Sequence, residues 1–202
     1  MIFKAAAICF TLFQMQSSPL TLYRQSIDKQ RVAVAGKGSS RIVKFILFVL
    51  NQFNRKVDYS TSEGEKISDA SVVIVECLDA EQFLGYHHHI LILSQLEPDL
   101  KSHYLSLANA TPKGGTILFD ETDPVASAIA KAERTDVTSN SFAIANHEMQ
   151  NGKALLITST NEKFPTPFSS VDDLKNMSAA QELLKKIGIS SGQFYGAIGS
   201  FQ

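Results

Sequence analysis

The sequence predicts an α/β fold, namely a mostly parallel, doubly wound sheet flanked by helices, with a small antiparallel hairpin region in the C-terminal half. Three observations support this prediction. Short continuous runs of Val, Ile and Leu alternate with helical segments, which is typical of parallel strands covered on both faces. The helix expected over residues 42–53 is apolar on nearly all sides, so it must be buried against a sheet. No repeat, low-complexity tract or linker divides the chain, which predicts a single domain over residues 1–202.

The first half of the chain predicts helices and strands in alternation. Uninterrupted β-branched residues indicate the strands, and the 3.6-residue spacing of apolar side chains indicates the helices. The expected elements are a helix at 3–9, a strand at 11–15, a helix at 20–26, a strand at 31–35, a helix at 42–53 and strands at 56–59 and 71–75.

The second half of the chain continues the alternation of strands and helices, and then predicts an antiparallel hairpin. Strands are expected at 90–93 and 116–119, with helices at 101–108 and 125–132. Residues 142–146 and 154–158 flank an Asn-Gly turn, which predicts an antiparallel hairpin whose edge joins the main sheet. A closing helix is expected at 173–187, where Gly188 provides a C-terminal cap.

Composition and charge narrow the classes of function. The 202 residues carry a net charge of -1 and a sequence pI near 6.5, which provides no broad positive field for nucleic acid or an anionic membrane surface. The two cysteines, Cys9 and Cys77, lie in apolar surroundings far apart in sequence and form no disulfide framework, so we expect a cytoplasmic protein. The run from Lys4 to Phe13 imitates a secretory signal, but no A-x-A-like cleavage site follows it.

A glycine-containing loop follows the strand at 31–35 and precedes the buried helix, a context in which backbone N–H groups bind phosphate. A working G-x-x-x-x-G-K-[ST] loop places its Lys directly after the last Gly. Here Ser39 occupies that position, and Lys37 lies on the other side of Gly38. The alternative is a plain turn between strand and helix. The candidate nucleotide-binding residues of the loop are Gly36, Lys37, Gly38, Ser39, Ser40 and Arg41.

Further segments follow this loop in a recognisable order. They are SDASVVIVE at 68–76, LSQLEPDL at 93–100, PKGGT at 112–116, DETDP at 120–124, LKNMSAA at 174–180 and residues 193–201. Together with residues 31–40, these segments resemble the central ATP-binding domain of the Mur ligases. The resemblance is strongest to the branch that joins UDP-N-acetylmuramate to L-alanine or to a murein tripeptide. It implies a P-loop-like fold and ATP-dependent amide-bond formation.

The same comparison shows departures from the residues that carry the family's chemistry. Ser39 stands where the family has its phosphate-binding Lys, and Leu100 stands where it has a His near the nucleotide. The remaining departures are Gln95 for an Asn, Leu78 for an acidic residue and Asp172-Asp173 for a His-Asn pair. Glu76, which matches an acidic metal ligand, and Asn176, which matches the end of the adenine-site motif, are retained.

Three other features invite a chemical interpretation. Glu76 is either a weak Mg²⁺ ligand or a strand-end carboxylate that accepts hydrogen bonds from the next turn. In the run His87-His88-His89 neighbouring side chains point to opposite faces, so at most two converge on a metal, and a loop is the alternative. Cys77 has no partner at a catalytic spacing and is expected to be a buried thiol.

Taken together, these features predict a degenerate Mur-ligase-like central domain without ligase activity and without catalytic residues. Phosphoryl transfer depends on positioning and electrostatics, and the replaced Lys and His remove two groups that balance phosphate charge. The resemblance also implies that the flanking domains are absent. We expect a binding or scaffold protein linked to peptidoglycan metabolism, whose partner is another protein such as a complete Mur ligase. The alternatives are a residual nucleotide-binding protein that takes ATP and Mg²⁺, or one chain of a split ligase.

Overall fold

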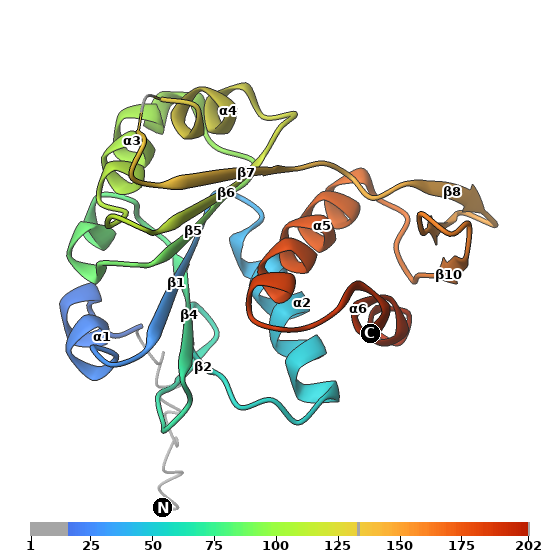
Figure 1. Cartoon of the computed structure of the whole chain (residues 1–202), viewed down its shortest axis with the longest axis horizontal. Helices are drawn as coiled ribbons and strands as arrows, with labels where there is room; N and C mark the ends of the chain where they lie inside the picture. The colour runs from blue at the N-terminus through green and yellow to red at the C-terminus, as the bar shows by residue number, and fades with distance from the viewer. Residues whose placement is uncertain (1–15, 133, 202) are drawn as a thin grey trace, which may run out of the picture.

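The computed structural model describes residues 16–132 and 134–201, and Figure 1 shows a twisted sheet between two layers of helices. Seven strands form this sheet in the order β3-β2-β4-β1-β5-β6-β7. Neighbouring strands pair in parallel except β3, which is antiparallel to β2. The strands are β1 (Gln30–Ala35), β2 (Asp58–Thr61), β3 (Gly64–Lys66), β4 (Val72–Cys77), β5 (Ile90–Leu93), β6 (Thr116–Asp120) and β7 (Thr138–Phe142).

Helices cover both faces of this sheet, which confirms the doubly wound α/β prediction. One face carries α2 (Ser39–Gln52), α5 (Val171–Lys186) and α6 (Ser191–Ile198), whose buried side chains share a core with Val32 and Val34 of β1. Ala33 and Ala35 point to the second core on the opposite face. That face carries α1 (Pro19–Gln25), η1 (Gln82–Tyr86), η2 (Pro98–Leu100), α3 (Lys101–Asn109) and α4 (Pro124–Ala130).

Local sequence explains where several helices begin and end. The Ser18 side chain caps α1, whose first residue is Pro19, and Ser190 and Gln193 form a reciprocal capping box at the start of α6. Asp123 caps α4 by accepting hydrogen bonds from two backbone N–H groups. Gly188, at φ +89, follows α5 as expected for a C-terminal cap.

A second, separate sheet contains the predicted hairpin. β8 (His147–Gln150) and β9 (Lys153–Ile157) are joined by Asn151 and Gly152, which both have positive φ as a type I′ turn requires. The hairpin pairs with β10 (Lys163–Pro165) in an antiparallel sheet of its own. The prediction that the hairpin begins at Phe142 and joins the main sheet is therefore wrong. Phe142 ends β7, which occupies the edge of the main sheet by pairing in parallel with β6.

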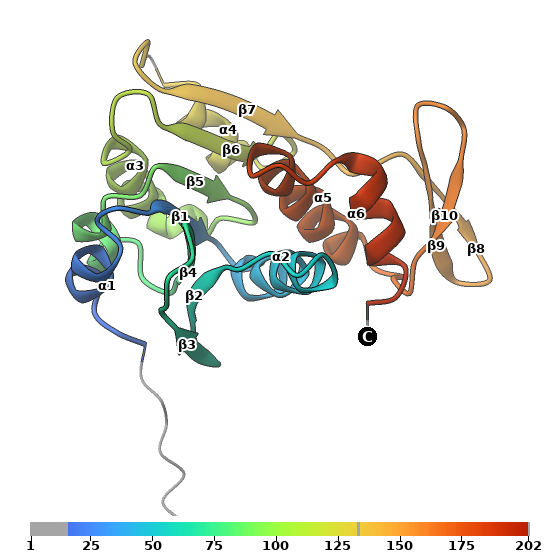
Figure 2. The same cartoon turned by 60° about the horizontal axis from the view of Figure 1, so that its bottom comes forward.

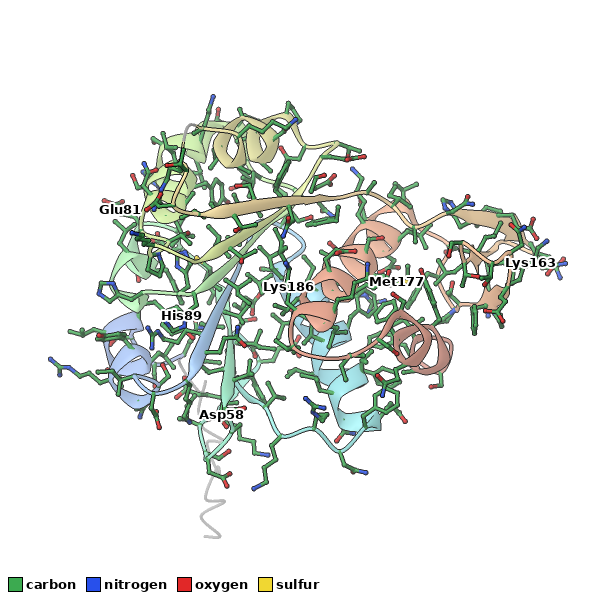
Figure 3. All side chains as sticks on the ribbon, in the orientation of Figure 1. Asp58, Glu81, His89, Lys163, Met177 and Lys186 are labelled. Carbon is green, nitrogen blue, oxygen red and sulfur yellow. The ribbon has the colours of Figure 1, made fainter. Side chains whose placement is uncertain are left out.

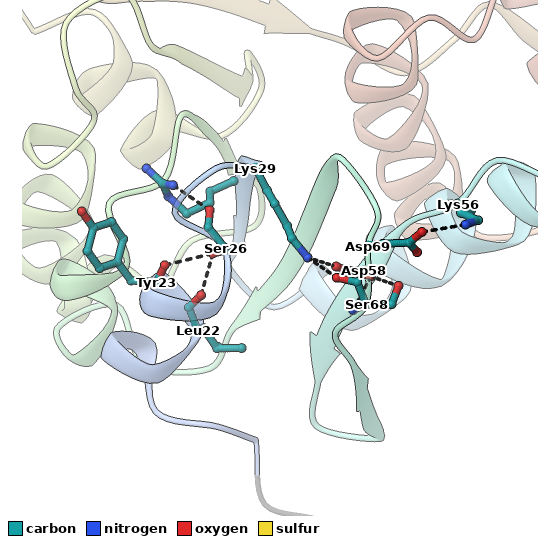
Figure 4. A network of polar contacts seen from close by, with 9 residues as sticks. Leu22, Tyr23, Ser26, Lys29, Lys56, Asp58, Ser68 and Asp69 are labelled. Atoms are coloured by element: carbon teal, nitrogen blue, oxygen red, sulfur yellow. Dashed lines mark hydrogen bonds and ion pairs between the residues drawn. The ribbon is translucent and has the colours of Figure 1, made fainter.

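The amino ends of the central strands are tied together by buried polar groups, shown in close-up in Figure 4. Lys29 Nζ donates to Asp58 Oδ2 at 2.5 Å and to the Ser68 carbonyl at 2.6 Å. Asp58 is fully buried and also accepts hydrogen bonds from the backbone N–H and hydroxyl of Ser68. In Figure 3, Asp58 and His89 both lie at this end of the sheet, away from Met177 on α5.

Two features concern the limits of the described chain. The helix expected at 3–9 and the strand expected at 11–15 lie outside the described residues, as does Cys9. In the described ranges, no helix combines the length and the apolar character that crossing a lipid bilayer requires.

Candidate functional site

The glycine loop lies at the carboxyl end of β1, in the middle of the sheet. Gly36 has φ +108, and a Cβ atom there would lie 1.8 Å from the Ser94 carbonyl oxygen, so only glycine fits. The Lys37 N–H donates to the Gln95 carbonyl at 3.2 Å, and the Ser39 N–H donates to the Gly36 carbonyl at 3.0 Å. These contacts hold the loop against the end of β5, and α2 begins directly at Ser39.

Glu76 and Ser39 meet beneath this loop. The Ser39 hydroxyl donates to Glu76 Oε1 at 3.2 Å. The other carboxylate oxygen, Oε2, accepts from the backbone N–H of Ser62 at 2.9 Å and from its hydroxyl at 2.8 Å. Glu76 is only 3% exposed. Both of its carboxylate oxygens are engaged in hydrogen bonds within the protein. This geometry agrees with a strand-end carboxylate bonded to the neighbouring turn.

The two cations of the loop point elsewhere. The Lys37 side chain is 65% exposed, and its ammonium lies 3.4 Å from Glu97. Arg41 donates from Nε to Asp173 at 2.8 Å, while its guanidinium lies over the rings of Phe45 and Phe201 at 4.8 and 4.9 Å. Both positive charges are therefore already paired with carboxylates instead of facing an open anion site.

Some backbone donors at the start of α2 are open. Within residues 16–132 and 134–201, the N–H groups of Gly38, Ser40 and Arg41 have no acceptor. Such groups at a helix N-terminus attract anions through their partial positive charge. The loop thus keeps the backbone part of an anion site, although its cationic side chains are engaged elsewhere.

Asn176 on α5 packs against the loop at Gly38. Its Oδ1 accepts a hydrogen bond from Gln95 Nε2 at 3.1 Å, and it lies so close to Gly38 that a Cβ there would be 2.1 Å from this oxygen. Gln95 itself has φ +54°, a left-handed backbone conformation that residues other than glycine rarely adopt. The predicted residues Gly38 and Asn176 are therefore in contact, and Gln95 bonds to Asn176 through its side chain and to Lys37 through its carbonyl.

Sequence reasoning missed several polar groups at this end of the sheet. Asp120, 2% exposed, lies at the end of β6, and Lys175 Nζ of α5 lies 3.6 Å from its Oδ2. The Ser94 hydroxyl is buried and has no hydrogen-bond partner in the described part of the chain. Asp120 and Ser94 each stand at or just after the end of a parallel strand, a position that the sequence could have flagged. Ser62 gave no such signal, because β2 is short and polar.

The residues present do not fit Mg²⁺-bound ATP as a phosphoryl donor. Such a donor needs a cation at its terminal phosphates and a carboxylate with oxygens available to the metal. The Glu76 oxygens accept three hydrogen bonds, and Lys37 is turned toward Glu97. Nor do the described residues contain a group of three or more His, Cys, Asp or Glu side chains that could hold a metal ion.

The three consecutive histidines diverge at the opposite end of the sheet. His88 is fully buried, and its Nε2 lies 2.8 Å from the Thr111 hydroxyl. His89 faces Arg31, whereas the His87 ring packs edge-on against Tyr23. Cys77 is buried, and this burial raises the pKa of its thiol well above the ordinary value. Neither feature contributes to the loop described above.

Comparison with known proteins gives a match in structure alone. No protein-family profile and no curated protein sequence matches the chain. A UDP-N-acetylmuramate:L-alanyl-gamma-D-glutamyl-meso-diaminopimelate ligase from Neisseria meningitides is similar at 12% identity and a TM-score of 0.69, over 91% of this chain and 70% of that one. A murein peptide ligase from Psychrobacter arcticus is similar at 14% identity and a TM-score of 0.73, over 92% of this chain and 50% of that one.

A third similar structure is a variant of FPGS from L. casei, at 10% identity and a TM-score of 0.67, over 94% of this chain and 69% of that one. At such identities the likeness establishes the fold, which is Mur ligase-like, and nothing about activity. The chain spans only about half of several of the ligases that it matches.

Proposed function

We propose that this chain is a degenerate Mur-ligase-like domain that does not carry out ATP-dependent ligation and acts as a binding or scaffold protein. One observation supports this proposal above the others. Ser39 occupies the position at which the resemblance places a phosphate-binding lysine, and its hydroxyl donates to Glu76. A serine there supplies no positive charge, and its contact with Glu76 uses an oxygen that a metal ion would need.

The electrostatics around the loop support the same proposal. Phosphoryl transfer has little covalent chemistry for a protein to perform and depends on positive groups aimed at the phosphates. Glu76 and Asp120 are buried acids at this end of the sheet, and Lys37 and Arg41 are already paired with Glu97 and Asp173. A triphosphate would therefore meet two buried acids and cations that have other partners.

The partner that we propose is another protein of peptidoglycan metabolism, a complete Mur ligase being the first candidate. This part of the proposal rests on the resemblance and on the names of the similar structures. A chain that supplies half of a split ligase is the alternative of the same class. Purified complete Mur ligases should bind this chain in a pull-down, and failure of every such enzyme to bind would contradict the proposed partner.

A second candidate function, residual nucleotide binding, is favoured by the open N–H groups of Gly38, Ser40 and Arg41. In this alternative the backbone at the start of α2 holds a phosphate group, and Glu76 supports a metal ion. The two candidates differ in what a titration should show.

The test is calorimetric titration of the purified chain with ATP and with ADP, each with and without Mg²⁺, followed by assays for ATP hydrolysis and ligation. The scaffold proposal predicts no saturable binding up to low-millimolar nucleotide and no turnover. Saturable binding that weakens in Glu76→Ala but not in the exposed control Glu63→Ala would favour the second candidate. Ligation or ATP hydrolysis above background would overturn the proposed function.

A further inference from the structure

A cavity of about 440 Å³ lies between α5, α6 and the small antiparallel sheet, apart from the glycine loop. Figure 2 shows this sheet standing beside α6. No residue of the loop at 36–41 lines the cavity, nor does Glu76 or Asn176. Its volume falls in the range of small-molecule sites, about 300–1,000 Å³. The cavity is therefore a candidate site independent of the Mur-ligase-like loop.

Gln181 of α5 lines this cavity, and its side-chain amide is the lining group that indicates most about a ligand. The residue is only 6% exposed, yet its side-chain amide forms no hydrogen bond with any described residue. The amide nitrogen and oxygen are not among the buried side-chain atoms that lack a partner in the described residues, so both are accessible from the cavity and can bond to a molecule held there. A ligand that offers both a donor and an acceptor would satisfy this amide from the cavity side.

Other hydrogen-bonding groups around the cavity are also unengaged. The side chains of Asn146, Ser159 and Ser191 line it and have no hydrogen-bond partner in the described ranges. Ser178 differs, because its hydroxyl accepts from the Ala145 N–H and donates to the Leu174 carbonyl. With Gln181 and the hydroxyl of Tyr195, the open side-chain groups comprise two amides and three hydroxyls, of which those of Asn146 and Ser159 are exposed. All of them are neutral, and each can donate and accept.

An apolar wall completes the cavity. The rings of Phe164 and Tyr195 are stacked, with centroids 5.4 Å apart and an interplanar angle of 21°, and both line the cavity together with Ile157. A ligand that packs one face against this wall and turns hydroxyl or amide groups toward Gln181 would use both kinds of surface. Saccharides combine an apolar C–H face with several hydroxyl groups in this way.

The charges of the lining disfavour an anionic ligand. The charged residues are Glu162, Glu182 and Lys185, which sum to -1. Lys185 is already paired with Glu182 at 2.5 Å. A phosphate or carboxylate would therefore meet the Glu162 carboxylate, which has no cationic partner among the described residues, and no free cation from the lining.

We propose that this cavity binds a neutral, hydroxyl-rich ligand of the saccharide type, held by the Gln181 amide and packed against the Phe164–Tyr195 wall. The proposal goes beyond the scaffold function and does not depend on it, since the cavity shares no residue with the glycine loop. Either of the two proposals can fail without the other.

The test uses calorimetry and saturation-transfer NMR on the whole chain, with glucose, N-acetylglucosamine and glucose 6-phosphate as probes. At least one neutral sugar should bind saturably in the millimolar range or tighter, and glucose 6-phosphate should bind at least threefold more weakly than glucose. Gln181→Leu should weaken binding of the neutral sugar at least tenfold without lowering Tm, because it removes an amide that has no internal partner. Gln52→Leu, at an exposed position on α2, is the matched control and should bind as the unmodified protein does.

Three results would overturn the proposal: binding of none of the sugars, equal affinity in Gln181→Leu, or tighter binding of the phosphorylated sugar. If Gln181→Leu fails to fold, Tyr195→Leu provides the second variant. It removes half of the aromatic wall and should weaken binding of the neutral sugar at least threefold, whereas unchanged affinity would contradict the proposed site.

Discussion

Charged side chains are buried at the amino end of the main sheet, whereas the charged side chains of the loop at the carboxyl end lie closer to the surface. At the amino end, Lys29 and Asp58 form a buried ion pair, and Arg31 donates to the carbonyl oxygens of Ser26 and His87. At the carboxyl end the loop also forms hydrogen bonds, but its cations lie toward the surface and backbone N–H groups of α2 remain open. Ligands of open α/β sheets bind at the carboxyl end of the strands.

This difference separates polar groups that hold the fold from polar groups at a ligand-binding position. At the amino end Lys29 and Asp58 are buried and depend on each other, so a change to this pair should appear as lost stability. At the carboxyl end Glu76 and Asp120 are buried, but the loop cations Lys37 and Arg41 make more exposed contacts, so a change to the loop should cost less. Substitutions at the two ends therefore test the comparison directly.

The largest effect is expected for Lys29→Met, at the amino end. The substitution leaves the fully buried Asp58 carboxylate without its cation, and breaking such a buried pair costs about 3–5 kcal/mol. Burial alone would raise the pKa of Asp58, but hydrogen bonds from Lys29 and Ser68 hold it below the ordinary value. The stability from this lowered pKa is present above about pH 3.8 and is lost as the pH falls further, because the unfolded chain then binds more protons. Urea denaturation at pH 7 measures the loss.

The same close-up contains a matched control for this substitution. Lys56 pairs with Asp69 at 2.9 Å, and both side chains are exposed, at 73% and 75%. Lys56→Met should leave the free energy of unfolding unchanged within error, because an exposed pair is well screened. Equal losses in the two variants would show that burial does not distinguish the two ion pairs.

The second effect is a pH dependence that originates at the amino end. Burial lowers the pKa of His88 to about 3, and the charges of His89, His87 and Arg31 act in the same direction. The unfolded chain, with a histidine pKa near 6.5, therefore binds more protons between about pH 6.5 and 3, so stability falls as the pH falls through this window. Between pH 7 and pH 5 we expect a loss of about 2 kcal/mol from this group alone.

His88→Gln should flatten this pH dependence, since glutamine can still bond to the Thr111 hydroxyl but does not titrate. His103→Gln is the control, because the His103 side chain is 43% exposed. Denaturant melts at several pH values between 5 and 7 give the slopes. If His88→Gln and the unmodified protein show the same slope, buried His88 is not the group that responds to pH.

Much of the fold could be predicted from the sequence, because burial on both faces leaves a clear apolar signal. The strand at Ile90–Leu93 was predicted to the residue, and the apolar pattern of residues 42–53 identified α2. The sequence did not predict β7, for the opposite reason: four of its five residues, Thr138 to Ser141, are polar. A polar edge strand has no apolar pattern, so its place in the sheet depends on pairing with β6 that the sequence does not reveal.

The candidate site was only partly predictable. Its position followed from the strand, glycine and helix in succession, and the structure brings Gly38 and Asn176 together. The partners of Glu76 could not be predicted, because Ser62 lies in the turn after β2, which becomes a neighbour of Glu76 only when β2 pairs with β4. The sequence likewise gave no sign of the cavity around Gln181, since that cavity lies between a long helix and the small sheet.

The smallest effect concerns the carboxyl end and the contact between the loop and α5. Gly38 has φ -82, which suits any residue, so the cost of Gly38→Ala arises from its contact with Asn176 and not from backbone strain. Because the contacting atom belongs to a side chain that can move, we expect a loss of about 1–2 kcal/mol. In an Asn176→Ala background the same substitution should cost less than half as much, which a double-mutant cycle by urea denaturation would detect. Gly196→Ala on α6, where nothing lies near the added methyl group, should be neutral or stabilising. Additive losses for Gly38→Ala and Asn176→Ala would instead show that the loop and α5 are not energetically coupled.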